Sequence, residues 1–124
     1  NDMSSRDIEG QNPLYLPQAK TYDGSCALGP GIRIMQPEEM ADLMIGLQIK
    51  REAQTVFEGE TSTAQMKRSF TELAGYLCRE LSFPQGAYLM TGTGIVPPDD
   101  FTLHVGDAIS ITIGGDTLQN TVAQ

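Results

Sequence analysis

The chain has 124 residues, which is enough for one modest domain and too few for two. Its 8 Lys and Arg residues stand against 16 Asp and Glu residues, so the net charge is −8. This balance argues against nucleic acid as a partner, because that affinity depends on Lys and Arg contacts to phosphate. It also argues against docking on an anionic membrane surface. No apolar run approaches the roughly 20 residues that a membrane-spanning helix needs.

Residues 1–36 are rich in Gly, Pro, Asp and Ser, and no helical period of useful length fits them. We predict an irregular segment there, with one or two short extended pieces. At Pro37, a proline followed by acidic residues predicts one short helical turn. Cys26 and Cys78 match no zinc or redox spacing, so we expect buried free thiols in a reducing compartment. We therefore expect a cytoplasmic protein.

Two β-hairpins are predicted from alternating apolar residues. Residues 43–49 alternate with period two, residues 51–54 are polar enough to turn the chain, and residues 55–58 then pair back. Residues 108–113 alternate in the same way, and a Gly-Gly-Asp turn leads into residues 117–122. Strands outnumber helices and no βαβ alternation occurs, so the expected fold class is α+β and mainly β.

One packed helix is predicted over about residues 63–81. Ser62 and Gln65 fit a capping box at its start. A single apolar stripe follows at helical spacing, which should pack on a core while the opposite face meets water. Residues 87–90 then predict a short strand. The stripe consists of Met66, Phe70, Leu73, Leu77 and Leu81.

The opening segment offers a metal ligand. Asp2, with Asp7 and Glu9 nearby, supplies the carboxylate oxygens that Mg²⁺, Mn²⁺ or Ca²⁺ prefer. The alternative is a polar loop with a local ion pair to Arg6. Mg²⁺ can be held by one or two carboxylates together with water and substrate oxygens, so Asp2 remains a candidate.

Lys20 and the turn at residues 91–94 are further candidates. A lysine near prolines is usually a solvated charge, but one that is desolvated beside a cation can act as a base. The two hydroxyls and free N–H groups of the Thr-Gly-Thr-Gly turn suit a carboxylate, although a turn without a ligand is the alternative. His104 stands alone and is expected to be structural or at the surface. Glu58 and Glu60 are expected to serve the turn and the dipole of the following helix.

Taken together, these motifs resemble the fumarylacetoacetate hydrolase family. Residues 1–7 look like that family's Asp-x-(Ser/Thr)-x-Arg-Asp segment, and Lys20 lies where the family has its motif lysine. Residues 58–62 and residues 91–93 look like two later signatures. The resemblance covers essentially the whole chain, with the motifs in order and at fitting intervals.

Residues 9–20 and 22–30 are similar to one branch of this family, the 2-keto-3-deoxyarabonate dehydratases. The family's C–C bond hydrolases usually have a proline directly after the Thr-Gly-Thr signature. Here residues 94–97 read Gly-Ile-Val-Pro, which again looks like the dehydratase branch.

The resemblance implies a mixed β-roll of the fumarylacetoacetate hydrolase type, built around Mg²⁺ or Mn²⁺, and a homodimer. Asp2 matches the family's metal-binding aspartate, whereas the two glutamates of its Glu-x-Glu motif belong to an upstream strand that this chain lacks. Residues 1–124 are therefore expected to be the C-terminal part of a single catalytic domain, incomplete for catalysis by itself.

The implied activity is that of a hydro-lyase dehydrating a 2-keto-3-deoxy sugar acid to a dioxo acid. Lys20 would be the catalytic base, and Arg6, Thr91 and Thr93 would form the binding site for the small-molecule 2-oxo acid. Within it, Thr93 would hold the substrate carboxylate, Thr91 would support the turn, and Arg6 would either orient Asp2 or bind the substrate anion. One alternative is an acylpyruvate-type C–C bond hydrolase of the same family. The other is a catalytically silent fragment that acts as a structural or dimerising module.

Overall fold

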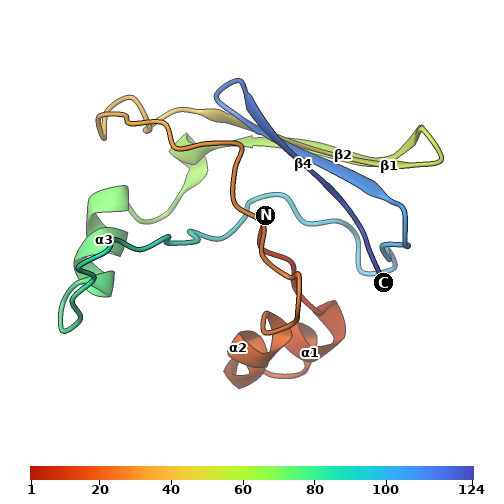
Figure 1. Ribbon diagram of the computed structural model, residues 1–124, viewed down its shortest axis with the longest axis horizontal. Coiled ribbons are helices and arrows are strands. Elements are labelled where there is room, and N and C mark those ends of the chain that lie inside the picture. Colours follow the sequence, from red (N-terminus) through yellow and green to blue (C-terminus); the bar gives the residue numbers. More distant parts are fainter.

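The computed structural model describes all residues 1–124, and its centre is a four-stranded antiparallel sheet of strand order β2-β1-β3-β4 (Figure 1). Both predicted hairpins are confirmed, and they join along β1 and β3. The second strand is longer than the predicted 55–58. The strands are β1 (Met44–Arg51), β2 (Gln54–Ser62), β3 (Ala108–Ile113) and β4 (Asp116–Thr121).

The inner face of the sheet carries the apolar residues of the alternating pattern. Ile49 on β1 lies opposite Ile109 on β3, and these side chains are only 3% and 4% exposed. Successive side chains in a strand point to opposite faces, so the outer face carries mainly polar residues. A mainly β α+β fold is thereby confirmed. Only four residues of the chain are buried, namely Ala19, Ile49, Asp107 and Ile109.

The segment between α3 and β3 lines the inner face without forming a strand. The rings of Phe101 and Phe57 lie 5.7 Å apart between centroids. A Cβ added to Gly59 would come within 2.7 Å of the Ile95 side chain, so Ile95 packs directly on β2. The predicted strand at residues 87–90 is wrong, because no neighbouring backbone pairs with it.

Residues 1–27 form a separate helical unit below the sheet (Figure 1). The prediction of an irregular segment is wrong for residues 6–19, because their prolines begin helices rather than only breaking them. It is confirmed for residues 1–5, which are extended, and for residues 21–36, which form no helix or strand. Pro13 opens a 3₁₀ helix, which Asn12 caps by accepting a hydrogen bond from Leu14 N at 2.9 Å. The helices are α1 (Arg6–Gln11), η1 (Pro13–Tyr15) and α2 (Leu16–Ala19).

The predicted helix over 63–81 is interrupted and much shorter. Ser62 caps only a 3₁₀ turn, η2 (Thr63–Gln65), after which Met66 is extended. The Thr63 hydroxyl bonds residues 40 and 43, which ties this turn to the preceding loop. The α-helix proper is α3 (Phe70–Leu77), and its N-cap is Ser69, which accepts a hydrogen bond from Glu72 N.

The helix is also not packed as predicted. α3 has no buried residue, and Figure 1 shows it beside one end of the sheet rather than on its face. The tight turn predicted at Pro37 is present, with Met40 N bonded to Pro37 O at 3.2 Å. The cysteines are free as predicted, but both are exposed rather than buried. None of the helices has the length and apolar character needed to cross a bilayer.

Candidate active site

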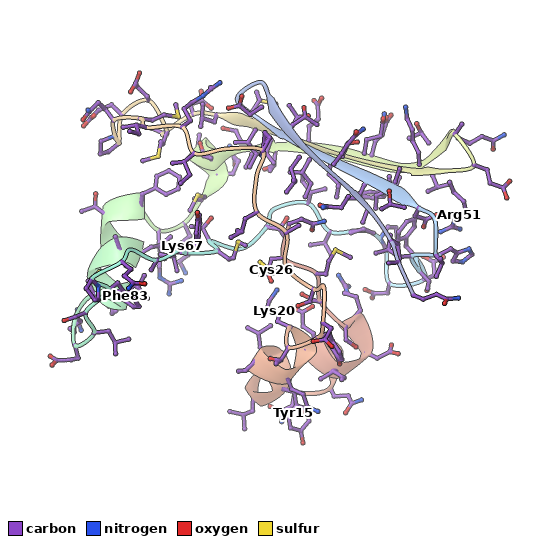
Figure 2. The ribbon with its side chains drawn as sticks, in the orientation of Figure 1. Tyr15, Lys20, Cys26, Arg51, Lys67 and Phe83 are labelled. Carbon is purple, nitrogen blue, oxygen red and sulfur yellow. The ribbon has the colours of Figure 1, made fainter.

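The Lys20 amine contacts the Asp2 carboxylate. Lys20 Nζ donates hydrogen bonds to Asp2 Oδ2 and to Ser4 Oγ, each at 2.8 Å. The side chains of Lys20 and Asp2 are 33% and 28% exposed, so the pair is partly desolvated and still reachable. Figure 2 shows Lys20 on the side of the helical unit that faces the sheet, with Tyr15 on the far side. The structure thus brings together a fixed amine and a carboxylate that are 18 residues apart.

The backbone around this pair is held by hydrogen bonds within residues 1–27. Residues 1–5 are extended and run antiparallel to residues 25–27, with an isolated bridge between Asp2 and Cys26. The end of α2 closes the other side, where Ala19 is fully buried. The bonds run from Met3 N to Ser25 O at 2.8 Å, from Ser5 N to Ala19 O at 2.8 Å and from Ala27 N to Asn1 O at 2.9 Å.

Ser4 is a site residue that the sequence reasoning missed. In an extended segment, residues two apart point to the same side, so Ser4 faces Lys20 together with Asp2. The spacing Asp-x-Ser was visible in the sequence, and an extended reading of residues 1–5 would have found it. A shallow hollow of about 400 Å³ adjoins this segment, and its lining includes Ser4, Ser5 and Ser25.

Arg6 lies close in sequence to Asp2 but bonds elsewhere. Its guanidinium contacts Asp99 Oδ1 at 2.7 Å, in the loop before β3. The side chains of Arg6 and Asp99 are 47% and 97% exposed. Arg6 therefore does not orient Asp2 through a direct contact, and its role toward a substrate anion stays a prediction.

The Thr91-Gly92-Thr93-Gly94 turn lies against β2. A Cβ on Gly94 would lie 3.1 Å from Thr61 Oγ1, so the turn sits under the inner face of the sheet. Thr93 Oγ1 is 3.1 Å from both the N and the O of Ile95, which closes a local turn. No hydrogen bond joins Thr91 or Thr93 to Asp2 or Lys20.

Glu58 and Glu60 lie within β2, on its exposed outer face, so their predicted role at a turn and helix end is wrong. They line a polar hollow of about 680 Å³ together with Gln48. Phe57 and Gly59, which alternate with them, belong to the inner face. The glutamates are therefore on the face opposite the Thr91–Gly94 turn. His104 is exposed, as predicted, and its backbone N donates to Asp107.

This chain offers one candidate metal ligand, Asp2, and not a complete set of ligands for a metal ion. Asp2 offers a carboxylate whose oxygen already meets a cation, the Lys20 ammonium. No group of three or more His, Cys, Asp or Glu side chains is arranged to hold a metal ion. Carboxylate oxygen is the donor that Mg²⁺ and Mn²⁺ prefer, and a Mg²⁺ site can take one or two carboxylates from protein with other ligands from substrate and water.

Comparison with known proteins places this geometry in a family. Residues 1–123 match the family described as Fumarylacetoacetate (FAA) hydrolase C-terminal, and the chain belongs to that family.

Two relatives with which the chain shares close to half of its aligned residues are both named as dehydratases. The chain is 44% identical over 126 residues to a probable 2-keto-3-deoxyxylonate dehydratase of Haloferax volcanii, and the match spans 98% of this chain and 43% of the relative. It is 45% identical over 116 residues to 2-dehydro-3-deoxy-D-arabinonate dehydratase of Saccharolobus solfataricus, a match that spans 91% of this chain and 38% of that protein.

Solved structures agree with these relatives. A 2-keto-3-deoxy-D-arabinonate dehydratase complexed with magnesium and 2,5-dioxopentanoate superposes with a TM-score of 0.89 at 44% identity. The apo form of that enzyme gives the same values. This chain covers 98% of its own length but 44% of each of those chains, so it spans less than half of the proteins that it matches.

Proposed function

We propose that this chain provides the Lys20 and Asp2 part of the active site of a hydro-lyase that dehydrates a 2-keto-3-deoxy sugar acid. The observation that carries the proposal is the contact of Lys20 Nζ with Asp2 and Ser4, each at 2.8 Å. The dehydratase relatives, at 44% and 45% identity, support this substrate class. The chain then contributes the C-terminal part of a single catalytic domain.

In this proposal Lys20 removes a proton from C3 of the 2-oxo acid. The C3–H electrons form the enolate, the C4 hydroxyl leaves as water after it gains a proton, and tautomerisation gives the dioxo acid. Lys20 accepts this proton on the lone pair of Nζ. Ser4 and Asp2 fix the direction of the amine, which general base catalysis requires.

Asp2 is the residue of this chain that would hold a divalent cation, Mg²⁺ or Mn²⁺. Such a cation would supply Lewis-acid stabilisation of the charge that develops on the keto oxygen. Arg6, Thr91 and Thr93 are proposed to bind the substrate carboxylate, because guanidinium, hydroxyl and backbone N–H groups all donate to anions. The exposed free thiols are compatible with the reducing cytoplasm.

The test is dehydration of 2-keto-3-deoxyarabinonate, followed by appearance of the dioxo acid, in the full-length protein that contains this chain. Lys20→Met should lower kcat/KM by at least about 10²-fold. Lys67 is an exposed lysine without an ion pair, so Lys67→Met is the matched control and should stay within about threefold of the unsubstituted protein. Unaltered turnover in Lys20→Met would refute the base assignment.

The same assay separates the other two hypotheses. Turnover of an acylpyruvate in place of the sugar acid would show a C–C bond hydrolase. No turnover of either substrate, with folding verified by circular dichroism, would favour a silent structural module.

A homodimer is proposed as the assembly. Large apolar side chains remain exposed on this chain, including Ile34 at 93% and Leu14 at 82%. Contiguous exposed apolar surface marks contact surfaces in proteins, and a second copy is the occupant proposed for it. Sedimentation equilibrium of the full-length protein tests this, and a monomer at micromolar concentration would contradict it.

A further inference from the structure

The helical unit of residues 1–27 is joined to the rest of the molecule by few polar contacts. Within the unit, backbone hydrogen bonds and the Lys20–Asp2 pair hold the chain together. Only two hydrogen bonds leave it, and both are between side chains: Asn1 Nδ2 to Asn120 Oδ1 at 3.2 Å, and Arg6 to Asp99 at 2.7 Å. Figure 1 shows the unit standing away from the sheet.

The Arg6–Asp99 pair is the charged and shorter of these two ties. It spans 93 residues and connects the first residue of α1 with the loop that follows the Thr91–Gly94 turn. Arg6 comes directly after the extended segment that carries Asp2 and Ser4. A movement of Arg6 therefore moves that segment and the amine bonded to it.

The loop that carries Asp99, at the other end of this ion pair, is held in place by contacts with the sheet. The loop of Asp99 continues into residues 101–107, where Phe101 packs on Phe57 and Asp107 is clamped by Arg51. Before Asp99, Ile95 packs on Gly59 of β2. Asp99 thus projects from a loop that the sheet holds on both sides, although its own side chain is 97% exposed.

We infer that Asp99 is a positioning residue that, through Arg6, sets the Lys20 amine relative to the Thr91–Gly94 turn. This inference rests on the proposed function, in which the amine and the turn act on one substrate. An exposed ion pair contributes little to global stability, so loss of this pair should leave the fold intact. Small misplacements of a catalytic group reduce turnover strongly, which gives such a tie its effect.

Asp99→Asn in the full-length protein tests this, because it removes the charge and keeps the shape. The expected result is a fall in kcat for the deoxy sugar acid of about tenfold or more, with an unchanged melting temperature. Asp99→Glu keeps the carboxylate and should recover most of the rate. Asp100 is the exposed neighbour without an ion pair, and Asp100→Asn is the control expected to leave kcat unchanged.

A distance measurement separates this inference from the proposed function. Nitroxides are placed on Gln11→Cys at the end of α1 and on Thr55→Cys in β2. Cys26, Cys78 and any other native cysteine of the protein are changed to serine, and the distance distribution is measured by electron–electron double resonance. Asp99→Asn should broaden or shift the distribution, whereas Asp100→Asn should not. If the protein turns over no substrate but Asp99→Asn changes the distance distribution, the proposed function is wrong, whereas the positioning of the helical unit by the Arg6–Asp99 pair is supported. An unchanged distribution together with an unchanged kcat would overturn the inference.

Discussion

Arg51 and Asp107 form a clamp between the end of β1 and the start of β3. The guanidinium donates from Nε to Asp107 Oδ1 and from Nη2 to Asp107 Oδ2, each at 2.8 Å. Asp107 also accepts from His104 N at 2.8 Å and is only 1% exposed. A further bond from Arg51 to Thr102 O at 2.9 Å fixes the loop. This bidentate arrangement is stronger than a single ion pair, and it holds the loop that carries Asp99.

Removal of the guanidinium should destabilise the protein. Arg51→Met leaves a buried carboxylate with only its His104 bond, and an uncompensated buried charge is costly. We expect the melting temperature to fall by roughly 10 °C in calorimetry. Arg33 and Asp116 form a matched pair at 2.8 Å that is 51% and 47% exposed, so Arg33→Met should lower it far less. Equal losses in the two variants would contradict the role of burial.

The clamp also predicts a dependence of stability on acid. The hydrogen bond from Arg51, followed by the bond from His104 N, lowers the pKa of Asp107 from its ordinary 3.8 to about 2. The unfolded chain therefore binds the proton more readily than the folded chain. The stabilisation is present above pH 3.8 and is lost as the pH falls toward 2. The free energy of unfolding, measured with urea across this pH window, should fall more steeply with decreasing pH in the unsubstituted protein than in Asp107→Asn. Parallel dependence on pH in the two proteins would contradict the role of Asp107.

The sheet could be predicted from sequence because its signal is local. Residues 43–49 and 108–113 alternate between apolar and polar, and each strand is followed by a turn and a partner. Residues 87–90 are also apolar, but no strand pairs with them. The sequence of a segment does not show whether a partner strand lies beside it. The predicted cap at Ser62 begins only a 3₁₀ turn, in which the Thr63 hydroxyl is bonded to the preceding loop, and α3 begins instead after Ser69.

The inner-face pair of Ile49 and Ile109 should dominate the stability of the sheet. Each side chain is at least 96% buried by its neighbours, so truncation leaves a cavity. Ile109→Ala is expected to reduce the free energy of unfolding by about 2–5 kcal/mol. Ile113 lies on the same face of the same strand but is 43% exposed, and Ile113→Ala should cost about 1 kcal/mol. Chemical denaturation measures both, and a larger loss at position 113 would refute this account of the core.

The candidate site could be predicted only at positions that match the motifs of the family. Asp2 and Lys20 were assigned from the family pattern, and the structure brings them into contact. The turn at residues 97–100 has a Pro-Pro-Asp-Asp signature, but the partner of Arg6 was not foreseeable, because Asp99 is 93 residues away and no local pattern links the two residues. Ser4 belongs to the Asp-x-(Ser/Thr)-x-Arg-Asp segment, but its hydrogen bond with Lys20 follows from the extended backbone of residues 1–5.

The turn between β1 and β2 contains strain that a substitution can relieve. Glu52 and Ala53 form a two-residue loop with φ values of 49° and 66°, in the left-handed region. Glycine adopts this region without steric cost and is preferred in such hairpin turns. Ala53→Gly should therefore raise the free energy of unfolding by about 0.5–1 kcal/mol. The reverse change, Gly115→Ala, lies at a residue whose φ is 96° and should destabilise the protein by a similar amount. A loss of stability in Ala53→Gly would contradict the turn geometry.

Asp2 is predicted to control the affinity for the divalent cation. Asp2→Asn removes the negative charge but keeps an oxygen near Lys20, so the backbone of residues 1–5 should persist. Isothermal titration of the full-length protein with Mg²⁺ should give a dissociation constant raised by about tenfold or more. Glu60 lies on the outer face of the sheet, so Glu60→Gln is the matched control and should bind as before. An Asp2→Asn protein with undiminished Mg²⁺ affinity would exclude Asp2 as a ligand, whatever its effect on turnover.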